Sequence, residues 1–154
     1  MSIDRADWHW EDTEKLYRQK HHITSDLTDE MEDEIWKLAG NHIGLFLQWI
    51  IENHFEGKDN NQELCEQVRN GKITGTEYFI EDCDCKFWEC DVCEEILPFV
   101  QYYYEKNDFY LNDYVDCCTN DEDKPLYHGV ISDINDYALL RQKINQAFEE
   151  FVKS

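Results

Sequence analysis

Four cysteines between positions 83 and 93 are the densest group of potential metal ligands in the chain: Cys83, Cys85, Cys90 and Cys93. Two thiolates separated by two residues, as at positions 90 and 93, can bind one tetrahedral zinc ion. Structural zinc sites usually combine two well-separated pairs, whereas only four residues lie between C-x-C and C-x2-C here. We therefore expect reduced, partly buried thiols and no cofactor. A zinc-dependent enzyme that uses these cysteines is the least favoured alternative.

His9 and His42 are the residues best suited to general acid-base chemistry. His9 lies between two tryptophans, and His42 precedes an isoleucine and a glycine on an apolar segment. No serine or cysteine nucleophile stands at a recognisable spacing from His42, and the six glycines do not form a phosphate-binding loop. We expect His42 to be half-buried and hydrogen-bonded to the backbone at a helix start, and we interpret His9 in the same way. The chain is not expected to be an enzyme.

The strongest chemical signal is negative charge. Thirty-five Asp and Glu residues stand against fourteen Lys and Arg, which gives a formal net charge of −21. A field of this size repels nucleic acid and anionic lipid, and it attracts basic protein surfaces. We therefore expect a cationic protein partner, with no binding to nucleic acid or membranes.

The carboxylates gather in three runs, at residues 26–34, 81–95 and 113–123, and aromatic residues lie among those of the second and third. Carboxylates interleaved with aromatic rings have the composition of a protein interface. The predicted partner-binding residues are Asp82, Asp84, Trp88, Glu89, Asp91, Glu94, Glu95, Asp113, Asp116, Asp121, Glu122 and Asp123.

Helical periodicity dominates the segments that must position these residues. An amphipathic helix is expected from Thr28, and residues 41–55 are apolar nearly all round, as in the buried central helix of a domain. We predict a mainly α fold: a compact single-domain helical bundle over residues 1–154, built around this central helix. Residues 1–27 are expected to form an irregular N-terminal arm whose tryptophans pack on the body. One short strand or hairpin can accompany the helices, at residues 126–131.

Local signals place the remaining helices. Asn60 with Glu63 and Thr74 with Glu77 resemble capping boxes at helix starts. A segment opened by Asp91 carries an apolar stripe, in which Pro98 marks a kink or a restart. Further helices are expected over residues 110–117 and from a cap near Ser132 or Asn135 to the C-terminal region.

The chain has the composition of a cytoplasmic protein. No stretch approaches the run of about 20 apolar residues that crosses a bilayer, and the first residues lack the layout of a secretory signal. The seven cysteines are then expected to stay reduced.

Three short segments resemble an uncharacterised bacterial domain family: ADWHW at 6–10, NHIGLFLQW at 41–49 and YYYEKNDFYLNDY at 102–114. Members of that family have a WH pair near the start, an HIG-x4-W helix and a YY…Y…DY segment. The family is associated with polymorphic toxin loci, where its members are presumed immunity proteins. The resemblance implies an immunity protein that neutralises a cognate antibacterial toxin domain.

From the negative charge we further expect this toxin domain to be basic. We expect its substrate to be nucleic acid or a nucleotide, because carboxylates can then occupy the positions of the substrate phosphates. An acidic DNA-mimic inhibitor, such as a phage-encoded blocker of a nuclease or of a host defence complex, is the alternative. The sequence makes no prediction of the oligomeric state.

Overall fold

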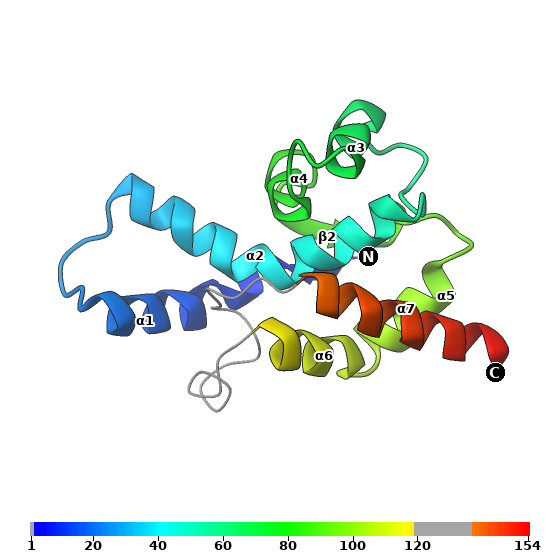
Figure 1. Ribbon diagram of the computed structural model, residues 1–154. Helices are drawn as coiled ribbons and strands as arrows, with labels where there is room; N and C mark the ends of the chain where they lie inside the picture. Colours follow the sequence, from blue (N-terminus) through cyan, green and yellow to red (C-terminus); the bar gives the residue numbers. More distant parts are fainter. Residues whose placement is uncertain (1, 119–136) are drawn as a thin grey trace.

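The computed structural model describes residues 2–118 and 137–154, and it confirms the mainly α-helical single domain (Figure 1). The elements follow in this order: β1 (Ser2–Arg5), the 3-10 helix η1 (Ala6–His9), α1 (Trp10–His21), α2 (Asp29–Glu52), α3 (Gln62–Arg69), α4 (Gly75–Glu81), β2 (Lys86–Trp88), the 3-10 helix η2 (Glu89–Asp91), α5 (Leu97–Val100), the π-helix η3 (Gln101–Glu105), α6 (Phe109–Cys118) and α7 (Tyr137–Lys153).

Helix α2 is the central element, as predicted, and it is longer than expected. The sequence pattern indicated two segments, over residues 28–39 and 41–55, but one helix of 24 residues runs from Asp29 to Glu52. The Thr28 hydroxyl caps it by accepting a hydrogen bond from the Met31 N–H at 3.2 Å. Its second half is almost entirely buried, with α3 and α4 on one side and α6 and α7 on the other (Figure 1).

Aromatic side chains fill the core on the α7 side of α2. Trp49 is fully buried and donates its indole N–H to Asn145 Oδ1 at 2.7 Å. Its ring contacts those of Phe46, Phe99 and Phe148, which belong to three different helices. Trp49 therefore belongs to the core, as expected for the apolar segment 41–55.

The N-terminal region differs from the irregular arm predicted for residues 1–27. Strand β1 pairs antiparallel with β2, so that Ser2 lies opposite Trp88 and Arg5 opposite Lys86, and η1 and α1 follow. A strand of four residues has too short a pattern to be recognised without its partner, which is more than 80 residues away. The predicted strand at residues 126–131 lies outside the described residues.

Of the two tryptophans predicted to pack this region on the body, Trp10 does so and Trp8 does not. Trp10 packs against Trp36 with ring centroids 4.4 Å apart, where α1 and the first turns of α2 form an antiparallel pair (Figure 1). A small second core lies between these two helices and contains Leu16, Tyr17 and Ile35. Trp8, in contrast, is 58% exposed, and the Arg5 guanidinium lies over its ring, 6.0 Å from the centroid.

Two of the predicted start signals are confirmed and one is displaced, and the start predicted at Asp91 is wrong, because Asp91 ends η2 and α5 begins at Leu97. Thr74 and Glu77 form the predicted capping box of α4, and Pro98 lies in the first turn of α5, where the chain restarts a helix. Asn61 rather than Asn60 caps α3, because the Asn60 amide donates to the Tyr78 hydroxyl at 2.6 Å. The caps predicted near residues 132 and 135 lie outside the described part of the chain.

Candidate functional site

The buried carboxylate of Asp4, in β1, forms hydrogen bonds with side chains from three other segments. His9 Nε2 lies 2.8 Å from Asp4 Oδ1, and His42 Nε2 lies 3.2 Å from Asp4 Oδ2. The Tyr104 hydroxyl donates to Asp4 Oδ2 at 2.6 Å, and the Arg5 backbone N–H donates to Oδ1 at 2.7 Å. We call Asp4, His9, His42 and Tyr104 the Asp4 cluster.

Four elements position the cluster. The turn from β1 into η1 brings His9 back over Asp4, and His42 projects from the middle of α2 with its ring centroid 4.6 Å from that of His9. Tyr104 comes from the π-helix. The Tyr110 hydroxyl of α6 donates to the backbone carbonyl of His42, which ties this part of α2 to the tyrosine-rich segment. The three segments of the family resemblance thus meet at one buried group.

Burial and hydrogen bonding set the protonation states of the cluster. Burial alone would raise the pKa of Asp4, but the hydrogen bonds from His42 and His9 outweigh it and hold that pKa well below its ordinary value. Burial lowers the pKa of His42, and the Asp4 carboxylate only partly offsets this effect. Burial and the charge of Asp4 raise the pKa of Tyr104 well above its ordinary value. At neutral pH, Asp4 is therefore ionised, while His42 and Tyr104 are neutral.

This geometry corrects the prediction for the histidines. His42 is not half-buried at a helix start: it is fully buried in the middle of α2, and its partner is a side chain. His9 is about one-quarter exposed and bonds to the same carboxylate. Asp4 and Tyr104 were not predicted as site residues, because their only local sequence signal was an aspartate five residues before His9.

The Asp4 cluster also contains potential metal ligands. One carboxylate oxygen of Asp4 and one ring nitrogen each of His9 and His42 lie within 4.8 Å of one another. Two imidazoles and a carboxylate form a ligand set that suits divalent transition metals.

The four cysteines of the zinc alternative do not converge in this way. Among the described residues, the three-ligand group is that of Asp4, His9 and His42. Cys83 is buried with its Sγ 3.9 Å from Asp91 Oδ1, whereas Cys90 is exposed. Burial, reinforced by the charge of Asp91, raises the pKa of the Cys83 thiol. Cys83 is therefore a protonated core residue and a poor ligand.

Most of the predicted partner-binding residues are on the surface. Asp82, Asp84, Trp88, Glu94, Glu95 and Asp116 are exposed, and Glu89 and Asp113 are half-buried. We call residues 81–95 the acidic segment; it runs from the end of α4 through β2 and η2 to the start of α5. Asp121, Glu122 and Asp123 lie outside the described residues.

Asp91 does not belong to the exposed surface that was predicted. It is only 9% exposed, and its carboxylate accepts hydrogen bonds from the Trp88 backbone N–H at 2.7 Å and the Asn60 amide at 3.4 Å. The first of these bonds closes η2. Burial raises the pKa of Asp91, although these hydrogen bonds partly oppose the shift. Asp91 therefore shapes the acidic segment from within.

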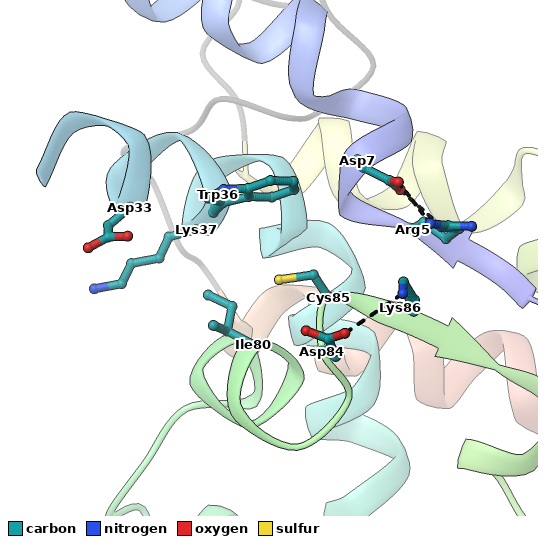
Figure 2. A pocket seen from close by; sticks show the side chains of 9 residues that line it. All are labelled: Arg5, Asp7, Asp33, Trp36, Lys37, Ile80, Asp84, Cys85 and Lys86. Carbon is teal, nitrogen blue, oxygen red and sulfur yellow. Dashed lines mark hydrogen bonds and ion pairs between the residues drawn. The ribbon is translucent and has the colours of Figure 1, made fainter. Parts of the chain in front are cut away.

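A pocket of about 620 Å³ adjoins the acidic segment (Figure 2). Trp36 forms one wall, and two ion pairs line the rim: Arg5 with Asp7 at 2.9 Å, and Asp84 with Lys86 at 3.7 Å. Asp84 and Cys85 have φ angles of 51° and 60°, which are uncommon for residues other than glycine. With Asp33 and Lys37, the lining contains three acidic and three basic side chains, so the formal charges of the pocket balance.

Comparisons with known proteins identify a family and no characterised relative. Among residues 2–118 and 137–154, no helix combines the length and apolar character needed to cross a membrane. Neither the curated proteins nor the solved structures give a significant match. The family model of a domain of unknown function, DUF7832, matches residues 2–129, most of the chain, and the protein therefore belongs to this family.

Proposed function

We propose that the protein is an immunity protein that binds a basic toxin domain through the acidic segment and thereby neutralises it. The observation that carries this proposal is the exposure of Asp82, Asp84, Glu94 and Glu95 in the same segment as an exposed tryptophan, Trp88. Charged residues usually go to the surface, but a large exposed aromatic ring among them is typical of binding sites.

The charge of the acidic segment is almost unopposed. Lys86 is the only Lys or Arg among residues 81–95, and its ammonium lies 3.7 Å from Asp84 Oδ2. The Asp84 side chain is 93% exposed, so this pair is solvated and leaves the carboxylate available to a partner. The remaining carboxylates carry a net negative field toward solvent.

The mechanism requires no bond making or breaking. The carboxylates attract the basic surface of the toxin over a distance comparable to the Debye length, about 8 Å at physiological salt. They then occupy the positions that the phosphates of a nucleic acid or nucleotide substrate would take. Trp88, which is 38% exposed, can bury its remaining surface in the complex and slow dissociation.

The test starts with capture of the partner from native cells and with the product of the neighbouring gene. The association rate is then measured at several salt concentrations for the wild type and for a variant with Asp82, Asp84, Glu94 and Glu95 changed to Lys. We expect the variant to associate at least about tenfold more slowly at low salt, with a flatter salt dependence. The matched control changes Asp26, Glu30, Glu149 and Glu150 to Lys, which alters the net charge equally at exposed positions outside the acidic segment.

Equal slowing of both folded variants would show that only the net charge matters and would contradict an interface at the acidic segment. Protection of cells from a toxin supports the immunity function. Capture of a nuclease or defence complex that is not encoded nearby would instead identify the DNA-mimic inhibitor.

A further inference from the structure

The Asp4 cluster combines a buried carboxylate with two imidazoles. Asp4 is 7% exposed and His42 is fully buried, and both lie among aromatic and aliphatic side chains of the core. The side chains that hydrogen-bond to Asp4 are two imidazoles and a phenol, of which His42 and Tyr104 are neutral at neutral pH, and the nearby Arg5 guanidinium pairs with Asp7 instead. A buried carboxylate is costly unless a positive charge compensates it.

We propose that Asp4, His9 and His42 bind a divalent transition-metal ion, with zinc as the best match. Imidazole nitrogens and a carboxylate oxygen are common zinc ligands, whereas magnesium and calcium prefer oxygen ligands alone. Metal binding at this site would be independent of any protein partner.

The distances fit an ion between the three side chains. Ligand atoms at about 2.0–2.2 Å from a tetrahedral zinc ion lie about 3.3–3.6 Å from one another. His9 Nε2 and His42 Nε2 lie 2.8 Å and 3.2 Å from the two oxygens of Asp4. These two distances run to different oxygens of Asp4, and the three ligand atoms all lie within 4.8 Å of one another. Side-chain movements of no more than about 1 Å would therefore bring them to tetrahedral spacing. The ion would replace the protons that now join each imidazole to the carboxylate.

The His42 ring can turn a lone pair toward the ion by changing its tautomer. A ring nitrogen that binds a metal must lose its proton to solvent or to the other ring nitrogen. His42 Nδ1 is buried without a hydrogen-bond partner among the described residues. Moving the proton of His42 from Nε2 to Nδ1 therefore breaks no other hydrogen bond.

Neighbouring groups would orient the Asp4 carboxylate, and the exposed edge of His9 would give an ion access to the site. Tyr104 donates to Asp4 Oδ2 and the Arg5 backbone N–H donates to Oδ1, as outer-sphere groups do for ligating carboxylates. The side chain of His9 is 24% exposed, so an ion can enter from this side and a water molecule can complete its coordination.

The test uses the whole protein, stripped with a chelator and titrated with zinc chloride by calorimetry at neutral pH. We expect one zinc ion per chain and a rise in Tm on zinc addition. His9→Gln keeps an amide that can donate to Asp4 but removes the metal ligand, and we expect at least about tenfold weaker binding. His54→Asn, at an exposed histidine with a φ of 59°, is the matched control and should bind like the wild type.

A second variant separates this site from the thiols, in which Cys85, Cys90 and Cys93 are changed to Ser. It should still bind one zinc ion, and cobalt bound to it should lack thiolate-to-cobalt charge-transfer bands. No stoichiometric binding by the wild type would overturn the assignment. So would binding that survives in folded His9→Gln, or binding that disappears with the cysteines.

Discussion

At the scale of single residues, Asp4 illustrates how a core can hold an ionised group. Its two oxygens accept from His9, His42, Tyr104 and the backbone N–H of Arg5, so both oxygens have two donors. Hydrogen bonds to an ionised acceptor are stronger than neutral ones, and losing one leaves part of a buried charge unsolvated. The cost of removing one donor should therefore exceed that of deleting an exposed hydroxyl.

Tyr104→Phe tests this expectation without changing the shape of the core. We expect the free energy of unfolding in urea to fall by about 1–3 kcal/mol, because Asp4 Oδ2 loses a donor. Tyr102→Phe, two residues earlier on the exposed side of the π-helix, should change it by less than about 0.5 kcal/mol. Equal effects of the two variants would contradict the role assigned to Tyr104.

At the scale of elements, the crossing of α2 and α4 depends on two glycines. A Cβ atom on Gly44 would lie 2.4 Å from Thr76 Cα, and one on Gly75 would lie 2.1 Å from the carbonyl oxygen of Gly44. The two backbones can be this close only because neither residue has a side chain. The crossing fixes α4 against α2, and α4 leads directly into the acidic segment.

Gly44→Ala should consequently destabilise the fold by about 2–3 kcal/mol, although alanine favours a helix, because Thr76 backbone atoms cannot move aside. Gly40→Ala is the comparison, since the added Cβ would meet the edge of the Phe79 ring at 2.7 Å rather than backbone. Urea unfolding should give a smaller loss for Gly40→Ala. A larger loss for Gly40→Ala than for Gly44→Ala would contradict the close backbone contact between α2 and α4.

The elements also show what sequence patterns can and cannot predict. Helix α2 and the Thr74 cap were predictable because their signals lie within a few residues. Strand β1 was not, because its partner β2 is distant in sequence. Likewise, the run of acidic residues gave no sign that Asp91 turns inward. The Asp4 cluster could not be predicted because His42 and Tyr104 lie 38 and 100 residues from Asp4.

At the scale of the whole molecule, a net charge of −21 on 154 residues must act against folding. Like charges spread over one surface repel one another, and the compact state brings them closer than the unfolded chain does. The aromatic core around α2 and α7 has to offset this repulsion. Dissolved salt screens it, with a Debye length of about 30 Å at 0.01 M and about 10 Å at 0.1 M.

The Tm should therefore rise as sodium chloride increases from about 0.01 M to about 0.3 M, with most of the change below about 0.1 M. The variant with Asp26, Glu30, Glu149 and Glu150 changed to Lys is the control, because its smaller net charge should weaken the dependence. Scanning calorimetry measures both. A Tm that falls with salt would show that attractive ion pairs outweigh the repulsion.

The hydrogen bond between Asp4 and Tyr104 also bears on the order of events during protein synthesis. A ribosome releases Asp4 long before Tyr104, because 100 residues separate them. Strand β1 has no partner until β2 at Lys86–Trp88 has been synthesised, and Tyr104 follows later still. Closing so long a loop is slow. We expect α1 and α2 to associate first in the nascent chain, and β1 to dock only after β2 and Tyr104 have emerged.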